Sequence, residues 1–274
     1  RQGELISSEG LTFEVIGRTG LPQRSFDFSS EVDYQNGQAH LSQVYRAHGF
    51  EGIVQTPDRA IKIYTSPVNK AMAPISEVKY IEEFGGHANF PEFVVSDTYQ
   101  CSDGRQRIYV ASEYVDGGTL SEVARGNNTI DDSQKLKVIA DCLGGLSLLH
   151  SEGLVHRDVK LPNIGITTVY GEDGSDVGGV LLDLGQVSRI GDKSAGITLT
   201  KGFDDPEIVA GAAPSPRHDI FATGRVLELT PFENQDVAEG AGRIATMMTA
   251  RAERPDALTG RELVLELRTQ ALSA

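Results

Sequence analysis

The chain has very little cysteine. Of its 274 residues, only Cys101 and Cys142 carry thiols. Two are too few for a disulfide scaffold or a cysteine-rich zinc site. Free thiols favour a reducing compartment, and we therefore expect the protein to act in the cytoplasm.

Long apolar runs are absent as well. No stretch approaches the roughly 18 residues that a membrane-spanning helix needs, so we expect no membrane segment. The first ten residues, RQGELISSEG, lack the apolar core of a secretion signal. The chain begins at Arg1 instead of a methionine, so we expect it to be a piece of a longer protein.

Basic residues are outnumbered by acidic ones. The sequence has 25 Lys and Arg residues against 39 Asp and Glu residues, which gives a net charge of −14 at pH 7. Such a charge disfavours general binding to nucleic acid or anionic membranes, and it favours basic protein partners. The content of 39% apolar and 23% charged residues is that of an ordinary globular protein with one or two compact units.

Polar residues gather at fixed offsets in the segment LVHRDVKLPN, residues 154–163. Asp158 can orient a hydroxyl group and accept its proton, and Lys160 can neutralise charge on a phosphoryl group during transfer. The amide oxygen of Asn163 can bind a metal ion. A solvated polar loop is the plainer alternative, but the pattern favours a site for phosphate and metal.

This segment resembles the catalytic loop of eukaryotic-type (Hanks-type) Ser/Thr protein kinases, H-R-D-x-K-x-x-N, at every fixed position. The resemblance extends from about Val32 to Leu272. It implies a bilobal α+β fold, with a small lobe built on an antiparallel β-sheet and a large, mainly helical lobe. We expect an N-terminal arm at 1–31, the small lobe at 32–115 and the large lobe at 116–274.

The glycine-rich loop of that family is degenerate in this chain. The pattern G-x-G-x-x-G-x-V leaves only Gly37, with Ala39 and Ser42 in place of the other glycines, and ends at Val44. Small residues still let a backbone approach phosphates, so Gly37 and Val44 would bind ATP in an altered way. The resemblance is therefore to a compact variant of the family with a degenerate loop.

Alternating residues predict a strand at RAIKIY, residues 59–64. By resemblance, Ala60 would contact adenine and Lys62 would bind the α- and β-phosphates of ATP. A lone lysine on a strand is more often simply exposed, but its order and distance relative to the other motifs favour the phosphate role. In the strand and hinge that follow, Glu113 and Val115 would offer main-chain groups to the adenine edge.

Apolar spacing predicts a helix over residues 75–84, ended by a pair of glycines. In the family, a glutamate on this helix pairs with the strand lysine, and Glu77 best matches its position. Glu82 and Glu83 lie on the same helix and remain alternatives.

In the second half, leucines and isoleucines at helical spacing predict a long helix from Asp131 to Leu149 that supports the catalytic loop. The sequence after Asn163 predicts a strand, a loop rich in Gly and Asp at 171–179, and a return strand. A solvated hairpin tip explains that loop better than a calcium site. The tripeptide D-L-G at Asp183 resembles D-F-G, so Asp183 and Asn163 would bind Mg²⁺, with Mn²⁺ as an alternative.

The segment after D-L-G would be the activation segment. Arg157, beside the catalytic aspartate, is the kind of residue that grips a phosphate there, and the resemblance implies regulation by phosphorylation. Ser194 and Thr198 are the candidate phosphosites. Thr200 is a further candidate regulatory residue, but it matches a threonine that Ser/Thr kinases keep near the catalytic Asp and Lys, so a structural role is its alternative.

Three further residues resemble structural positions of the family. GFDDPE replaces A-P-E, and Glu207 should pair with Arg254 across the large lobe. Asp219 matches a buried aspartate that holds the backbone of the catalytic loop. Between Leu229 and Ile244 there is little room for a helix that the family commonly uses for docking.

The resemblance implies a kinase that transfers the γ-phosphate of ATP to Ser/Thr hydroxyls of protein substrates, with autophosphorylation. The first alternative is a pseudokinase, a nucleotide- or partner-binding scaffold, which the degenerate loop and Gly165, in place of an apolar residue beneath adenine, favour. The second is a small-molecule phosphotransferase of related fold, which usually lacks a lysine at the position of Lys160. A pared-down large lobe would suit a bacterial kinase, including an effector delivered into a host cytosol.

Overall fold

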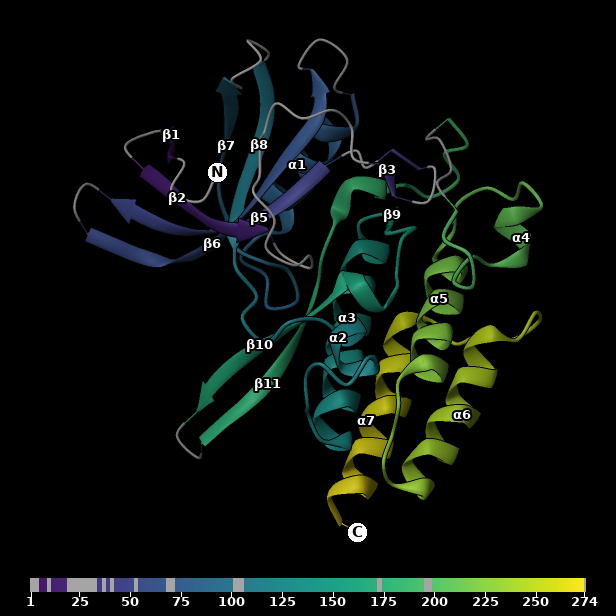
Figure 1. Cartoon of the computed structure of the whole chain (residues 1–274). Coiled ribbons are helices and arrows are strands. Elements are labelled where there is room, and N and C mark those ends of the chain that lie inside the picture. The colour runs from purple at the N-terminus through teal and green to yellow at the C-terminus, as the bar shows by residue number, and fades with distance from the viewer. Residues whose placement is uncertain are drawn as a thin grey trace. The chain divides into compact units, whose positions relative to one another are not determined.

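A computed structural model of the chain describes residues 5–8, 11–18, 34–35, 38–39, 42–51, 54–67, 72–100, 106–171, 174–194 and 199–273. The chain divides into two compact units, coloured purple to blue and teal to yellow in Figure 1. The sheet unit comprises residues 1–86 and 91–114, and the helical unit comprises residues 87–90 and 115–274. An antiparallel N-terminal sheet and a mainly helical C-terminal part confirm the predicted α+β fold class.

The sheet unit is built on a six-stranded antiparallel sheet in the order β1-β2-β5-β6-β8-β7. Its elements are β1 (Leu5–Ser8), β2 (Leu11–Arg18), β5 (Ser42–Glu51), β6 (Val54–Pro67), α1 (Met72–Phe84), β7 (Phe93–Gln100) and β8 (Gln106–Glu113). A small separate hairpin joins β3 (Tyr34–Gln35) to β4 (Gln38–Ala39). Because β2 pairs with β5, the strand in the segment expected as an arm is part of the main sheet.

Strand alternation in β6 sorts its side chains between two faces of the sheet. Ile61 and Ile63 are buried, together with Tyr109 and Ala111 of the neighbouring strand β8. Lys62 lies between the two isoleucines in sequence, so its side chain leaves the opposite face and stays half-buried. The pattern that builds the core of this unit thus also fixes the direction of the lysine.

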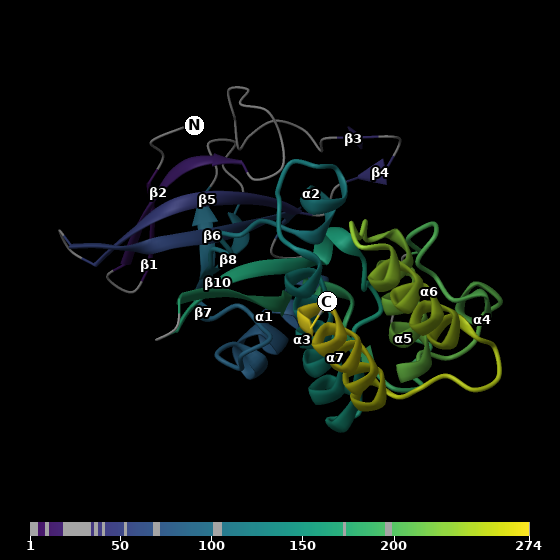
Figure 2. The same cartoon turned by 90° about the horizontal axis from the view of Figure 1, so that it is seen from below.

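The helical unit combines long helices with short strands and turns. Its elements are α2 (Leu120–Ala124), α3 (Asp132–Ser151), β9 (Leu154–Val155), η2 (Leu161–Asn163), β10 (Ile164–Gly171), β11 (Gly174–Leu181), η3 (Leu184–Gln186), β12 (Ser188–Arg189), α4 (Pro206–Val209), α5 (Pro216–Leu229), α6 (Gln235–Thr249) and α7 (Ala257–Ser273). Helix α7 packs along α3, and α6 packs along α5 (Figures 1 and 2). Among the described residues, no helix is long and apolar enough to cross a membrane.

Helix α3 forms the centre of this unit, close to the predicted range. Asp131 is its N-cap and accepts a hydrogen bond from the backbone N–H of Gln134 at 2.8 Å. One stripe of the helix is fully buried, at Leu136, Ile139, Leu143, Leu146 and Leu149. Burial of such a stripe stabilises the fold by about 1.5–3 kcal/mol for each large side chain. It also holds the C-terminal end of α3 in place, and the loop that carries the candidate site follows that end.

The prediction of a loop at 171–179 is wrong for most of that range. Strand β11 begins at Gly174 and pairs with β10 in unbroken register up to Leu181. Its glycines serve close packing: a Cβ at Gly179 would lie 2.2 Å from the carbonyl oxygen of Val138 in α3. A glycine-rich stretch therefore forms a strand here, because the hairpin backbone must approach a helix backbone.

The connection between α5 and α6 is short, as the sequence predicts. No helix occurs in residues 230–234, all of which the structure describes. The carboxylate of Asp132 accepts hydrogen bonds from the backbone N–H groups of Glu233 and Asn234, each within 3.1 Å. The loop is thereby fastened to the start of α3, and α6 follows at once.

Candidate active site

The segment after α3 is held by a buried aspartate of α5. The side chain of Asp219 is 1% exposed and accepts hydrogen bonds from the backbone N–H groups of His156 and Arg157, both at 2.8 Å. His150 of α3 contacts the same carboxylate at 2.9 Å. Arg157 has a positive φ of 69°, which is strained for a residue with a Cβ. Asp219 stabilises this conformation, as the sequence led us to expect.

Three side chains converge on the carboxylate of Asp158. Lys160 Nζ lies 2.7 Å and Asn163 Nδ2 2.9 Å from its Oδ2, and Thr200 Oγ1 donates to its Oδ1 at 2.9 Å. Asn163 Nδ2 also donates to the backbone oxygen of Asp158 at 2.9 Å. Both carboxylate oxygens are therefore oriented, and four residues that the sequence singled out meet at one point.

A backbone hydrogen bond places Asp183 close to Asn163. The N–H of Leu182 donates to the carbonyl oxygen of Asn163 at 2.9 Å, so the residue after Leu182 emerges beside Asn163. Asp183 has a positive φ of 60°, and its exposed side chain accepts a hydrogen bond from Gly185 N. With the amide nitrogen of Asn163 committed to Asp158, the amide oxygen is the atom left for a metal ion. Carboxylate and amide oxygens suit the hard cation Mg²⁺.

In the sheet unit, Lys62 forms an ion pair with Glu77 of α1. Lys62 Nζ lies 2.7 and 2.9 Å from the two carboxylate oxygens, and the Glu77 side chain is 7% exposed. The rival glutamates Glu82 and Glu83 are exposed. The hydroxyl of Tyr64 donates to the same carboxylate, a contact that the sequence analysis missed. Tyr64 lies two residues after Lys62 on one strand, and that spacing was the available signal.

Of the residues proposed for nucleotide binding, Gly37 lies outside the described residues. Val44 of β5 is half-buried and pairs with Lys62, while Ala60 is half-buried at the same register as Ser112 of β8. The backbone N–H of Glu113 donates to the carbonyl oxygen of Glu92 at 2.8 Å.

Gly165 is closely surrounded within the helical unit. A Cβ added there would lie 2.9 Å from Val180 Cγ2, 3.0 Å from Val115 Cγ1 and 3.2 Å from Leu182 Cδ1. Neighbouring apolar side chains thus occupy the space that a larger residue at this position would need. The absence of a side chain at Gly165 therefore does not leave a hole in this part of the unit.

Of the proposed regulatory residues, Ser194, Thr198 and Thr200 follow η3 in the sequence, whereas Arg157 lies on the loop of Asp158. Ser194 is exposed, and its hydroxyl donates to Asp192 at 2.6 Å, while Thr198 lies outside the described residues. Arg157 Nη1 donates to the carbonyl oxygen of Gln186 at 3.4 Å. Burial lowers the pKa of the Arg157 guanidinium, and the charges of Asp219 and Asp192 oppose that shift.

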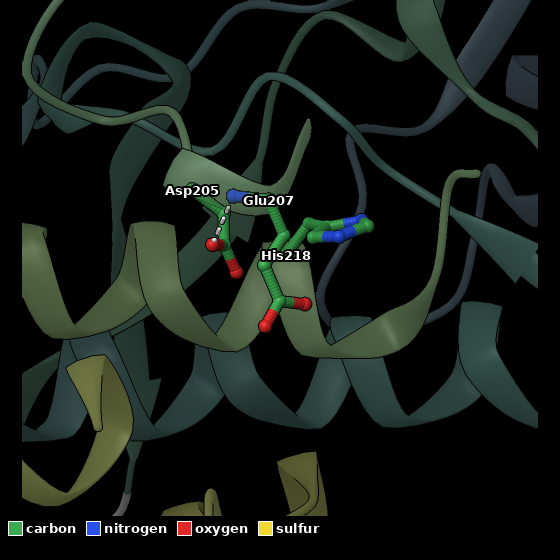
Figure 3. Close-up of side chains that lie close together, drawn as sticks. All are labelled: Asp205, Glu207 and His218. Carbon is green, nitrogen blue, oxygen red and sulfur yellow. Dashed lines mark hydrogen bonds between the residues drawn. The ribbon is translucent and has the colours of Figure 1, made fainter. Parts of the chain in front are cut away.

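The ion pair to Arg254 is made by Asp205, so the prediction of Glu207 as its partner is wrong. The guanidinium and carboxylate are 2% and 1% exposed, respectively. Asp205 also caps α4 by accepting a hydrogen bond from the backbone N–H of Glu207 at 2.9 Å (Figure 3). The cap turns the Asp205 side chain inward, where Arg254 meets it, and the side chain of Glu207 is left half-buried.

Asp205, Glu207 and His218 bring possible metal-ligand atoms within 4.8 Å of one another (Figure 3). Two contacts argue against a metal ion at this cluster. The charge of Arg254 already neutralises Asp205, and His218 Nδ1 accepts a hydrogen bond from the backbone N–H of Ser215 at 3.0 Å. The cluster therefore stabilises the starts of α4 and α5.

Sequence comparison gives the family to which this fold belongs. The family model described as protein kinase domain matches residues 36–257, most of the chain. The chain therefore belongs to the protein kinase domain family. Members of this family generally use ATP and Mg²⁺ to transfer a phosphoryl group to a protein substrate.

Curated relatives are similar at a distance. The chain is 26% identical to serine/threonine-protein kinase STE20 of Candida glabrata over 81% of this chain and 24% of that protein. It is 30% identical to serine/threonine-protein kinase PAK 1 of Mus musculus over 60% and 29% of the respective chains. The chain is 27% identical to serine/threonine-protein kinase PknB of Mycobacterium leprae over 69% of this chain and 29% of that protein. The chain thus spans less than a third of each of these relatives.

Proposed function

We propose that this chain is an active Ser/Thr protein kinase domain that transfers the γ-phosphate of ATP to protein hydroxyls. The observation that carries the proposal is the oriented carboxylate of Asp158. It is held by Lys160, Asn163 and Thr200 on a loop whose backbone Asp219 fixes. Such preorganisation is what phosphoryl transfer needs, because positioning and charge stabilisation supply most of the catalysis.

The acceptor chemistry would centre on Asp158 and Lys160. Asp158 orients the incoming hydroxyl and receives its proton as the new oxygen–phosphorus bond forms. The bond between the γ-phosphorus and the bridging oxygen breaks, and ADP leaves with that oxygen. Lys160 stabilises the negative charge of the transferring phosphoryl group. The lysine two residues after the aspartate, together with Thr200, favours Ser/Thr acceptors over tyrosine.

The donor, ATP, would be bound by the residues that match the nucleotide-binding motifs of the family. Lys62, kept in place by Glu77, would bind the α- and β-phosphates, while Asn163 and Asp183 would hold Mg²⁺. Bound Mg²⁺ supplies positive charge that neutralises the phosphates. The remaining nucleotide contacts come from Gly37, Val44, Ala60, Glu113 and Val115.

Regulation would act through the segment between η3 and α4. Arg157, with its φ of 69° and its contact to Gln186, is held next to the start of this segment. A phosphate on Ser194 or Thr198 would offer that guanidinium a charge-assisted hydrogen bond and order the segment. Autophosphorylation is the simplest source of such a phosphate.

Incubation with γ-labelled ATP and Mg²⁺ should transfer label to the chain itself and to a generic basic protein. The variant Asp183→Ala serves as the negative control, because it removes a proposed metal ligand. The side chain of Asp183 is exposed, so the substitution should not disturb the fold. Mass spectrometry should locate label on Ser194, Thr198 or a neighbour. If wild-type protein bound nucleotide but transferred no label with Mg²⁺ or Mn²⁺, the pseudokinase scaffold would replace the present proposal.

Glu77→Gln should lower kcat/KM for ATP by up to about 10²-fold, because Lys62 loses the charge that positions it. The variant keeps the volume and one acceptor oxygen for Tyr64, so its thermal stability should change little. Steady-state kinetics at varied ATP measure the effect. The matched control is Glu82→Gln, an exposed glutamate of the same helix, which should behave as wild type. Equal kinetics for the two variants would contradict the role of Glu77.

A further inference from the structure

A buried tyrosine contacts both members of the ion pair between Lys62 and Glu77. The hydroxyl of Tyr64 donates a hydrogen bond to Glu77 Oε2. The ring of Tyr64 also borders the lysine, with Lys62 Nζ 5.5 Å from the ring centroid. All three residues belong to the sheet unit, and Tyr64 is only 4% exposed. The phenol is therefore a built part of the interior of this unit.

The alternation of β6 brings Lys62 and Tyr64 to the same face of the sheet. Side chains two residues apart on a strand point in the same direction. Ile63 lies between them in sequence and is buried on the opposite face. Two donors of different chemistry, an ammonium group and a phenol, thus reach the carboxylate of Glu77 from neighbouring positions on one strand.

Helix α1 turns Glu77 inward as part of an otherwise apolar stripe. Glu77, Ile81 and Phe84 follow one another by four and three residues, and all three are buried. The helix packs chiefly beside β7, whereas the two donors to Glu77 come from β6. The carboxylate of Glu77 therefore links α1 to a second strand of the sheet.

A carboxylate buried to this degree needs hydrogen-bond donors, because it has lost most of its water. A hydrogen bond from a phenol to a charged carboxylate is of the stronger, charge-assisted kind. Under the proposed function, the ammonium of Lys62 has a second task, since it would also bind the phosphates of ATP. The hydroxyl of Tyr64 would continue to hold Glu77 while Lys62 is shared with the nucleotide.

We propose that Tyr64 is a positioning residue for ATP binding: its hydroxyl orients Glu77, and Glu77 orients the ammonium of Lys62. The proposal rests on the phosphate-binding role that the proposed function gives to Lys62. Tyr64 acts through the ion pair and takes no part in the chemical step. Because its ring borders the ammonium, Tyr64 also limits the directions in which the lysine side chain can move.

Hydrogen exchange tests whether Tyr64 holds the helix. Tyr64→Phe removes only the hydroxyl and keeps the ring beside Lys62. With one donor fewer on Glu77, the amides of residues 72–84 should exchange faster by about tenfold or more in the absence of nucleotide. Tyr80→Phe is the matched control, because it makes the same substitution at a half-buried position of α1 itself. Its exchange should remain that of wild-type protein.

A double-mutant cycle tests whether Tyr64 acts through Glu77. Tyr64→Phe should lower kcat/KM for ATP by about tenfold and leave KM for a peptide substrate nearly unchanged. In the background of Glu77→Gln, the same substitution should cause almost no further loss, because the charge that orients Lys62 is already absent. A tyrosine that served packing alone would lower kcat/KM by the same factor in both backgrounds. Calorimetry with ATP and Mg²⁺ on the same four proteins should show the same non-additivity.

Each outcome of these experiments decides a different point. Exchange of α1 at the wild-type rate in Tyr64→Phe, or equal losses of ATP affinity in the two backgrounds, would overturn the inference. Wild-type protein that binds ATP but transfers no label would overturn the proposed function alone, because ATP affinity and hydrogen exchange still report on Tyr64. Wild-type protein that binds no nucleotide would overturn both.

Discussion

Asp158→Asn should lower the rate of phosphoryl transfer by about 10²- to 10⁴-fold, the usual contribution of a positioned general base. The amide keeps the size of the side chain and one oxygen that can accept from Thr200 or Lys160, but it cannot accept the proton of the substrate hydroxyl. The loss should fall on kcat, because the interaction matters most in the transition state.

Nucleotide binding separates this effect from misfolding. Asp158→Asn should bind ATP and Mg²⁺ with near wild-type affinity, measured by calorimetry or by a shift in Tm. Asp236→Asn, on the exposed surface of α6, should retain full transfer. If Asp158→Asn transferred phosphate at the wild-type rate, the role of Asp158 would be wrong, and with it the mechanism proposed for the whole site.

Asp205→Ala should destabilise the protein by about 3–5 kcal/mol, the usual cost of removing one partner from a buried ion pair. Arg254 would remain buried with its charge uncompensated, although its Nε still donates to the carbonyl oxygen of Ala250 at 2.6 Å. Urea titration followed by circular dichroism measures the change as a lower midpoint. The loss should be smaller when Arg254→Met is added, because the unpaired charge is then gone.

Glu207→Ala is the matched control for Asp205→Ala. Its side chain is half-buried and forms no ion pair with Arg254, so the expected loss is below about 1 kcal/mol. A larger loss for Glu207→Ala than for Asp205→Ala would restore the pairing that the sequence motif suggested and contradict the one in the structure.

The Asp205 pair should also contribute to acid sensitivity. Burial alone would raise the pKa of Asp205, but hydrogen bonds from Arg254 and from the Glu207 N–H outweigh it and hold the pKa below its ordinary value. A carboxyl whose folded-state pKa is lowered contributes full stability above its unfolded pKa of about 3.9. That contribution is lost as pH falls through the folded-state pKa, so Asp205→Ala should show a weaker acid dependence below about pH 4.

The sequence by itself determined much of the fold and the members of the candidate site. The spacing of Leu136, Ile139 and Leu143 follows the 3.6-residue period of a helix. This period comes from the backbone geometry of the helix, so it predicts the helix whatever segment packs against it. The residues around Asp158 lie within six positions of one another, so Lys160 and Asn163 can reach its carboxylate within one short loop, whose backbone Asp219 holds. The alternation around Lys62 likewise fixes the face from which its side chain leaves the sheet.

Only the tertiary structure decided between residues that are equivalent in sequence. Glu77 and Glu82 lie on one helix and carry the same group, but only the buried Glu77 faces Lys62, at 2.7 Å, whereas Glu82 is exposed. Asp205 and Glu207 differ by two positions, and the cap of α4 turns the first toward Arg254. Both outcomes depend on which segments of the chain pack together. The free energy of that packing comes from contacts between residues far apart in the sequence.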